Sequence, residues 1–375
     1  MAALPWPLGV PVLSDGVVTL RAHTRDDVEP MWEMAQDPEM QRWTAIPVPH
    51  TRAMSEQFAL EHVPRGWDEG TARGWAIETT EGGGARYAGN VDVRGGVVAD
   101  LGFALHPWAR GRGVMARAVR LALDWSFTEG STEAIHWRSQ VGNEASLRVA
   151  HACGFRLHGT VPGLLHERGV VHDAWTASLS FGEPPLARTR WADAPVLETA
   201  RVLLRPLRHD DAPRVVEACS DPVTRHWLAG LPTPYTPASA RDFVHDCVWN
   251  AATGTKLTWA VADPEDDRLL ALVTIMDLQG LNPSTAELGY WAHPDARGRG
   301  VVTDAVRLAV EHAFAADGLG LQRLSLLAAA SNLASNQVAE RVGFRRVGVE
   351  RQAERLGDGS LDDLVCHDLL RTDLR

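Results

Sequence analysis

The sequence predicts a mixed α/β fold that is built twice in tandem along a chain of 375 residues. The first observation is a strand–loop–helix stretch at 99–114 that returns at 286–301, each time with a His-Pro turn and an Arg-Gly-Arg-Gly-Val loop. The second is that flanking motifs, such as Leu20-Arg21 and Leu204-Arg205, recur in the same order at a slowly growing offset. Such an offset is typical of a duplicated domain with small loop insertions.

Each repeat has the same order of predicted elements. Acidic pairs (Asp26-Asp27, Asp210-Asp211) stand where helix N-caps and first-turn acids belong. Glycines at 154 and 343 predict the end of a later helix. Short strands are predicted at Val17–Arg21, Trp75–Glu78, Tyr87–Val93 and Ala134–Arg138, and at Val202–Arg205, Leu257–Val261, Leu269–Met276 and Arg323–Leu327.

The domain boundary is expected in a proline-containing stretch between the repeats. We predict an N-terminal domain over 1–182, a linker over 183–199 and a C-terminal domain over 200–375. Pro184, Pro185 and Pro195 break any regular pattern there, and they favour a fixed connection over a floppy one.

Composition and charge exclude several classes of protein. With 45% hydrophobic and 23% charged residues, the chain is typical of globular proteins. A net charge of −11 without a basic stripe argues against nucleic-acid binding and suits a cationic acceptor. Four cysteines without metal spacing favour reduced thiols in a cytoplasmic protein. No signal peptide or membrane-length apolar run is present, so we expect no membrane partner.

The repeated loop is suited to binding a phosphate. It follows a strand and opens a helix, where free backbone N–H groups and the helix dipole favour an anion. Its glycines let a phosphate approach the backbone closely. The alternative is a tight strand–helix turn that binds no ligand.

These residues resemble the GCN5-related N-acetyltransferases (GNAT), within them the ribosomal-protein N-terminal acetyltransferase branch. Three features carry the resemblance in both repeats: the Arg-x-x-Gly loop (Arg110 to Gly113, Arg297 to Gly300), Asn-x-x-Ser at the start of a later helix, and Gly-Phe at that helix's end. The resemblance implies two consecutive GNAT-like domains, each a central mixed, mostly antiparallel sheet flanked by helices. We expect the two domains to pack as a pseudo-dimer in a monomeric chain.

The resemblance further implies transfer of an acetyl group from acetyl-CoA to a primary amine by direct attack. The amine of a peptide or small molecule must lose a proton before it attacks, and the departing thiolate must gain one. Asp100 and Glu287 stand where the family often carries its general base, with a solvated edge carboxylate as the alternative for each. Ser146 and Ser335 are the expected proton donors to the thiolate, with helix capping as the alternative.

Other residues are expected to bind acetyl-CoA, and no metal is expected. Loop backbone N–H groups would hold the pyrophosphate, and the two asparagines would hold the pantetheine arm unless they only cap their helices. A glycine after each expected base, Gly102 or Gly289, suits a bulge where the family's strands splay. The predicted set is Phe103, Leu105, Arg110, Gly111, Arg112, Gly113, Val114 and Asn143, with Tyr290, Ala292, Arg297, Gly298, Arg299, Gly300, Val301 and Asn332.

The chain departs from the family's loop pattern at one place. Met115 and Val302 stand where the family usually has Gly or Ala, two residues after the last fixed glycine. They would narrow the pyrophosphate site or point into the core, and the apolar helix pattern favours the core.

Two alternative functions remain open. One is a CoA-binding protein in which one unit is non-catalytic. The other is a longer-chain N-acyltransferase of secondary metabolism, since tryptophans such as Trp43 and Trp227 would suit an acyl tunnel. Both loops are intact, so both units are expected to bind CoA. If only one unit is active, the sequence favours the second, because Glu287 reaches further than Asp100 and Tyr290 adds a hydroxyl.

Overall fold

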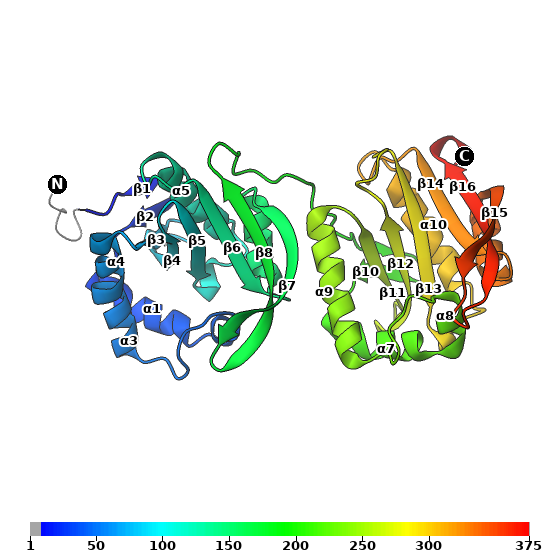
Figure 1. Cartoon of the computed structure of the whole chain (residues 1–375), viewed down its shortest axis with the longest axis horizontal. Coiled ribbons are helices and arrows are strands. Elements are labelled where there is room, and N and C mark those ends of the chain that lie inside the picture. Colours follow the sequence, from blue (N-terminus) through cyan, green and yellow to red (C-terminus); the bar gives the residue numbers. More distant parts are fainter. Residues whose placement is uncertain (1–8, 375) are drawn as a thin grey trace. The chain divides into compact units, whose positions relative to one another are not determined.

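A computed structural model describes residues 9–374 and divides into two compact units, Met1–Arg188 (unit 1) and Thr189–Arg375 (unit 2) (Figure 1). This division falls inside the predicted linker. Each unit is a sheet with helices on its faces, so the predicted mixed α/β architecture is confirmed. The pseudo-dimer stays a prediction.

Unit 1 follows the predicted order of elements. Its strands are β1 (Leu13–Ser14), β2 (Val18–Arg21), β3 (Ala72–Thr79), β4 (Arg86–Gly95), β5 (Val98–Leu105), β6 (Ala134–Gln140), β7 (Arg156–Glu167) and β8 (Val170–Ser180). Its helices are η1 (Arg25–Asp27), α1 (Val28–Ala35), α2 (Pro38–Trp43), α3 (Arg52–Gln57), η2 (Phe58–His62), α4 (Val63–Glu69), η3 (Pro107–Ala109), α5 (Val114–Thr128) and α6 (Glu144–Ala152).

Unit 2 repeats this order with one long helix, α9, where unit 1 has three shorter ones. Its strands are β9 (Leu197–Glu198), β10 (Leu203–Pro206), β11 (Leu257–Ala262), β12 (Leu269–Met276), β13 (Thr285–Ala292), β14 (Arg323–Ala329), β15 (Arg345–Arg355) and β16 (Leu361–Leu370). Its helices are η4 (His209–Asp211), α7 (Ala212–Ser220), α8 (Pro222–Trp227), α9 (Pro237–Thr253), η5 (Pro294–Ala296), α10 (Val301–Phe314), α11 (Leu333–Val342) and η6 (Arg371–Asp373).

The two sheets have the same topology. The order is β1-β2-β3-β4-β5-β6-β8-β7 in unit 1 and β9-β10-β11-β12-β13-β14-β16-β15 in unit 2. All neighbours are antiparallel except β5–β6 and β13–β14, which are parallel. A helix separates the strands of each parallel pair, as a parallel connection requires.

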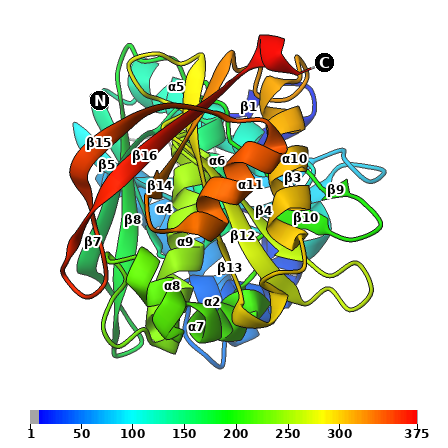
Figure 2. The same ribbon diagram turned by 90° about the vertical axis from the view of Figure 1, so that its right-hand side faces the viewer.

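Helices flank both sheets, and the helix that follows each glycine loop, α5 or α10, packs on the sheet of its own unit. In unit 2, α10 packs on β12 and β13 and beside α11, while α9 packs on β11 (Figure 2). The buried side of α10, including Val301, Ala305 and Val306, joins the largest apolar core of that unit. The loop that opens α10 is therefore held by a well-packed helix.

Tryptophans of the third strand of each sheet belong to the core. The side chains of Trp75 and Trp259 are fully buried, and their indole N–H groups donate to the carbonyls of Pro11 (3.2 Å) and Pro195 (2.9 Å). Trp75 also packs edge-on against Trp67 and Trp125. Packing rather than ligand binding accounts for these tryptophans.

The predicted linker packs on both units. Pro185 accepts a hydrogen bond from Arg120 in unit 1, and Arg188 donates to the carbonyl of Gly154 at 2.8 Å. On the other side of the boundary, Thr189 donates to Ala252 at 3.0 Å and Arg190 to Gly318 at 3.0 Å. Each end of the linker is thus anchored to the unit next to it.

The repeated Arg and Asp-Asp motifs form an ion pair that the sequence did not reveal. Asp27 and Asp211 stand at the N-cap position of α1 and α7, but neither makes a side-chain cap hydrogen bond there. Instead, both carboxylate oxygens of Asp211 accept from the Arg205 guanidinium at 2.8 Å, and Asp27 pairs with Arg21 in the same way. The Arg205 side chain is only 3% exposed.

Removing this carboxylate should destabilise unit 2. We expect Asp211→Ala to lower the free energy of unfolding of unit 2 by about 3 kcal/mol, the low end for breaking a buried ion pair, because Asp267 still faces Arg205. Urea unfolding, followed by hydrogen exchange in peptides of each unit, measures this change. The exposed neighbour gives the control Asp210→Ala, which should change stability little; equal effects of both variants would contradict the assignment.

Candidate active site

The parallel strands of each unit separate partway along their length. In unit 1 the ladder pairs Val98–Asp100 with Ala134–His136 and ends there, although β5 runs on to Leu105 and β6 to Gln140. In unit 2 the ladder likewise ends at Glu287 and Ser325. Past these points the facing edges of the two strands are free to contact a ligand. The splayed strands expected from the resemblance are present in both units.

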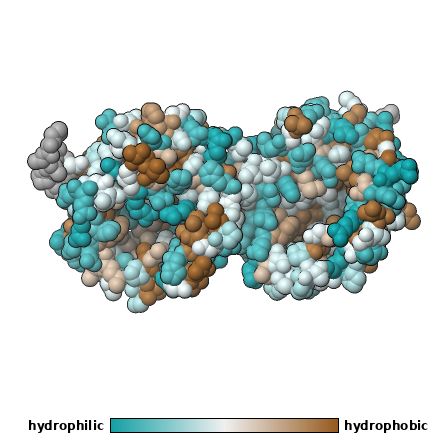
Figure 3. All heavy atoms as spheres, viewed as in Figure 1, coloured by the Kyte–Doolittle hydropathy of each residue, from teal (hydrophilic) through white to brown (hydrophobic). Residues whose placement is uncertain are grey.

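A large cavity lies between the splayed strands of unit 1. Its volume is about 1440 Å³, and Leu101–Leu105 of β5 and Trp137–Gln140 of β6 line it. Apolar side chains of the helices between β2 and β3 (η1 to α4, here called the helical segment), including Met31, Met40 and Phe58, form another wall. Figure 3 shows this face of unit 1 as hollowed, with brown and tan side chains beside hydrophilic teal ones. The cavity combines an apolar wall with titratable groups.

The glycine loop borders the same cavity. Gly111 and Gly113 adopt positive φ angles of 72° and 74°, and a Cβ on either would meet no atom within 4 Å. Gly113 is the N-cap of α5, so the first backbone N–H groups of that helix open beside it. The exposed backbone of the two glycines fits an anion such as a phosphate.

The loop of unit 2 has the same backbone but a different neighbour. Gly298 and Gly300 have φ angles of 72° and 78°, and Gly300 is the N-cap of α10. A Cβ on Gly300 would lie 3.0 Å from the Arg201 guanidinium, which donates to the carbonyl of Arg299 and pairs with Asp304 at 3.1 Å. An arginine therefore lies against the loop of unit 2.

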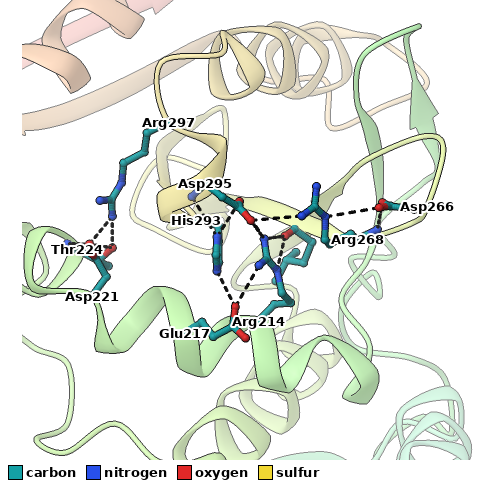
Figure 4. Close-up of polar contacts among 10 residues, drawn as sticks. Arg214, Glu217, Asp221, Thr224, Asp266, Arg268, His293, Asp295 and Arg297 are labelled. Atoms are coloured by element: carbon teal, nitrogen blue, oxygen red, sulfur yellow. Dashed lines mark hydrogen bonds and ion pairs between the residues drawn. The ribbon is translucent and has the colours of Figure 1, made fainter.

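The first arginine of each loop binds a helix N-cap. Arg110 donates to Asp37 at 2.5 Å, and Arg297 donates to Asp221 at 2.6 Å and to the Thr224 hydroxyl at 2.7 Å (Figure 4). The same carboxylates cap α2 and α8. These side chains thus fix the loop against the neighbouring helix, and any contact of Arg110 or Arg297 with a cofactor stays a proposal.

A further ion cluster supports the loop in unit 2. The buried His293 lies between two carboxylates, with Nδ1 at 2.8 Å from Asp295 and Nε2 at 3.1 Å from Glu217 (Figure 4). Arg214 binds Asp295 through both carboxylate oxygens, at 3.0 and 2.9 Å. Burial alone would raise the pKa of Asp295, but its bonds to Arg214 and His293 lower it.

The remaining loop residues lie at the helix starts. Arg112 and Arg299 are exposed, whereas Val114 and Val301 are buried and can offer a ligand only their backbone. Val302 packs against the core, as predicted, whereas Met115 is 5% exposed and also lines the unit 1 cavity, so the prediction that these larger residues point into the core is confirmed for Val302 alone.

Asn143 and Ser146 share the cavity of unit 1. Asn143 caps α6, its side chain accepting from the Ser146 backbone N–H at 3.2 Å, and both residues line the cavity. The Ser146 hydroxyl oxygen accepts from the indole N–H of Trp137 at 3.0 Å. The hydroxyl proton therefore remains available for another acceptor.

In unit 2 the serine has a different partner. Asn332 caps α11 at the Ser335 backbone N–H, 3.2 Å away, as in unit 1. The Ser335 hydroxyl, however, lies 2.9 Å from the hydroxyl of Tyr290 on β13. Burial raises the pKa of Tyr290 to about 12, so its hydroxyl stays protonated near neutral pH. Ala292 stands two residues later on the same splayed strand.

The two expected bases lie in different surroundings. Asp100 lines the cavity and is 40% exposed, and its carboxylate pairs with Arg138 at 3.0 Å. Glu287 is half-buried. Burial and the nearby charge of Asp277 raise the pKa of Glu287, whereas Lys256 lowers it.

Sequence reasoning missed Asp92 and misjudged Gly102. The β4–β5 register runs unbroken past the Asp92–Gly102 pair, and the β12–β13 register runs unbroken past Gly289, so the expected bulges are absent. The space above Gly102 is instead filled by Asp92, whose oxygens lie 2.8 and 3.1 Å from where a Cβ would stand, and by the Arg94 guanidinium at 2.9 Å. The alternation of Asn90, Asp92 and Arg94 along β4 is the signal that could have revealed this acid.

Neutralising Glu287 should stabilise unit 2 in a pH-dependent way. Because folding raises its pKa, native Glu287 holds its proton more tightly than the unfolded chain does, and its stabilising contribution is lost as pH rises through the raised pKa. We expect Glu287→Gln to raise Tm at pH 7 by a few degrees, about 2–4 °C per kcal/mol, with the gain shrinking toward pH 4. Calorimetric scans test this; a gain independent of pH, or one matched by the exposed control Glu265→Gln, would contradict it.

In residues 9–374, no group of three His, Cys, Asp or Glu side chains is placed to hold a metal. Within the same described range, the helices are too short or too polar to cross a membrane.

Comparison with known proteins identifies both units. The acetyltransferase (GNAT) domain model matches residues 18–156 and again 201–345. The chain is 35% identical over 100 residues to the ribosomal-protein-serine acetyltransferase of Escherichia coli (strain K12), covering 27% of this chain and 54% of that protein. It is 34% identical over 106 residues to YdaF of Bacillus subtilis (strain 168), covering 28% and 56%. It thus spans about half the length of these curated relatives.

A solved structure, Mycobacterium smegmatis RimJ in complex with CoA-disulfide, aligns with 49% of this chain and 90% of its own at 23% identity and a TM-score of 0.44. The domain matches cover most of the sequence, once in each unit. The chain belongs to the GNAT acetyltransferase family and carries its domain twice.

Proposed function

We propose that unit 1 transfers an acetyl group from acetyl-CoA to a primary amine. The observation that carries this proposal is the cavity of about 1440 Å³, which the glycine loop, the splayed strands and the Asn143–Ser146 helix start all border. These are the parts that the reaction needs in one place: an anion site, an exposed strand edge and a polar hydroxyl. This cavity is the reason for proposing unit 1 as an active unit, although the sequence favoured unit 2.

The residues present fit acetyl-CoA as the co-substrate. The open glycines of the loop and the N–H groups at the start of α5 would hold the pyrophosphate. The β6-facing backbone of Phe103 and Leu105 would bind the pantetheine arm and the thioester, together with Asn143. Acetyl-CoA supplies the activated acyl group.

The chain's own groups move the protons. A carboxylate in the cavity accepts a proton from the acceptor's ammonium group, and the neutral nitrogen then attacks the thioester carbonyl. The C–N bond forms as the C–S bond breaks. Ser146, held by Trp137, donates its hydroxyl proton to the thiolate and recovers one from the new amide nitrogen. No covalent intermediate on the protein is needed.

The acceptor is proposed to be an amine on a peptide or small molecule. The E. coli relative is named as a ribosomal-protein-serine acetyltransferase, which supports a protein N-terminus as one candidate. Five acidic side chains (Glu39, Glu61, Asp92, Asp100 and Glu167) line the cavity of unit 1 together with five arginines (Arg65, Arg94, Arg110, Arg138 and Arg148), so the acids can receive a cationic amine locally while the lining as a whole is close to neutral.

Unit 2 is proposed to bind CoA and to differ from unit 1 in catalysis. Its loop keeps both left-handed glycines, but Arg201 lies against this loop, and the Ser335 hydroxyl is hydrogen-bonded to the hydroxyl of Tyr290. This contrast favours a CoA-binding partner unit as the second candidate role.

Separate loop variants test the two sites. A carboxylate in either loop should repel the pyrophosphate, so we expect Gly113→Glu and Gly300→Glu each to remove one of two acetyl-CoA sites in calorimetric titration. Each variant serves as the control for the other. A wild-type stoichiometry of one, lost in one variant and unchanged in the other, would contradict the two-site proposal.

Turnover by each loop variant tests the proposed active unit. Only Gly113→Glu should abolish CoA release with a panel of primary amines. Activity lost in Gly300→Glu instead would place catalysis in unit 2, and a wild type that binds CoA but acetylates no amine would overturn the proposed activity. Octanoyl-CoA and palmitoyl-CoA in the same assay test the longer-chain alternative.

The Trp137–Ser146 contact should matter for chemistry rather than for binding. We expect Ser146→Ala to lower kcat by about 10²-fold while leaving the Kd for CoA within a few-fold, because only the proton donor is lost. Trp137→Phe should lower kcat less, since the hydroxyl remains but is no longer held. Steady-state kinetics and calorimetry measure both values. An equal loss of affinity in Ser146→Ala would indicate a binding role instead.

A further inference from the structure

One of the acidic residues that line the unit 1 cavity, Asp92, lies directly beside the expected reaction point. Asp92 lies on β4, not on the strand where the family's base is expected, and it lines the cavity. We propose that Asp92, rather than Asp100, is the general base of unit 1 that takes the proton from the acceptor amine. This inference rests on the proposed acetyl transfer in unit 1.

The register of β4 and β5 brings Asp92 to the reaction point. Asp92 pairs directly with Gly102, and Asp100 pairs with Arg94. The β5–β6 ladder ends at Asp100, so Gly102 lies just past its last rung, next to Phe103, whose backbone faces the free edge where the thioester is expected. Since glycine has no side chain, the Asp92 carboxylate lies directly over this backbone, 2.8 and 3.1 Å from the position of a Cβ. A larger residue at 102 would displace it.

The surroundings of Asp92 suit a base better than those of Asp100. Its side chain is 23% exposed, against 40% for Asp100. The titratable and charged groups that line the cavity with it are Arg94 on its own strand, Asp100 on β5, Arg138 on β6 and Glu167 on β7, with Glu39, His50, Glu61, His62, Arg65, Arg110 and Arg148 on the helices and loops. Burial raises the pKa of Asp92, and the charges of Arg94 and His62 partly offset this. A raised pKa makes a carboxylate a stronger base.

Asp100 is held in a different way. Its carboxylate pairs with Arg138 on the neighbouring strand at 3.0 Å, beside the last rung of the β5–β6 ladder. Asp92 pairs instead with Arg94 on its own strand, with the Arg94 Nε at 3.1 Å; this guanidinium is 57% exposed, and its Nη2 lies 2.9 Å from the position of a Cβ on Gly102, beside the Asp92 carboxylate. The ion pair of Asp100 thus bridges β5 and β6 and positions the strands where they separate.

Unit 2 provides an internal comparison. The residue that pairs with Gly289 is Thr274, and its hydroxyl lies 3.1 Å from that of Thr258. Met276 takes the place of Arg94, and its Cε would lie 2.9 Å from a Cβ on Gly289. A methionine thus covers this point in unit 2, where the Asp92 carboxylate and the Arg94 guanidinium cover it in unit 1.

The step balances without any further reactant. The ammonium N–H bond breaks and its proton goes to an Asp92 oxygen; the nitrogen lone pair forms the C–N bond. The C–S bond then breaks, the thiolate receives a proton through Ser146, and a second N–H proton replaces the one that Ser146 gave. Asp92 finally releases its proton to solvent. One amide, one free thiol and one proton result.

Steady-state kinetics of matched variants of the full chain test the assignment. With acetyl-CoA and a primary amine that the wild type acetylates, we expect Asp92→Asn to lower kcat at least 10²-fold and to flatten the rise of rate with pH. Asp100→Asn should stay within about tenfold of wild type and keep that pH profile. Asp92→Glu should recover part of the activity. Calorimetry should give wild-type CoA stoichiometry in all three, which shows that they are folded.

The outcomes separate this inference from the proposed function. Near wild-type kcat and pH profile in Asp92→Asn, or the large loss in Asp100→Asn instead, would overturn Asp92 as the base while leaving acetyl transfer intact. Loss of CoA binding in Asp92→Asn would assign the residue a structural role and overturn the proposal as well. A wild type that binds CoA but acetylates no amine would overturn the proposed function, and the inference with it.

Discussion

In each unit, the ion pair between the first arginine of the glycine loop and the N-cap aspartate of a helix connects the loop to the start of that helix. Asp37 and Asp221 cap α2 and α8, and the same carboxylates bind Arg110 and Arg297. One acidic group thus fixes the glycine loop on one side and the start of the neighbouring helix on the other. The loop needs such support, because its glycines have no side chains to anchor it.

The separation of the parallel strands gives unit 1 its site. Hydrogen bonds hold β5 to β6 only as far as Asp100, and the cavity begins where the ladder ends. Antiparallel pairing with β4 stays regular over the same stretch, so β5 keeps its shape while one edge is exposed. A ligand can therefore use strand backbone that is already ordered, which lowers the entropic cost of binding.

The two units keep their common backbone and differ in the side chains around it. Both have left-handed glycines at the loop, an asparagine cap and a splayed strand pair. Around this frame, Trp137 holds the serine in unit 1 and Tyr290 holds it in unit 2. The backbone geometry of the loop, the helix cap and the splayed strands thus persists in both units, while the side chains that contact the serine hydroxyl have diverged.

The sequence alone determined what depends on near neighbours in the chain. Turn glycines, asparagine caps and strand periodicity act within a few residues, so the duplicated domain, the loops and most strand positions could be predicted. Only the tertiary structure decided how Asp92 meets Gly102, how Arg205 meets Asp211 and how Trp137 meets Ser146. Such contacts depend on strand register and on the packing of separate elements. The physical reason is that local conformational preference fixes the elements, whereas the site is made of side chains that pairing and packing bring together.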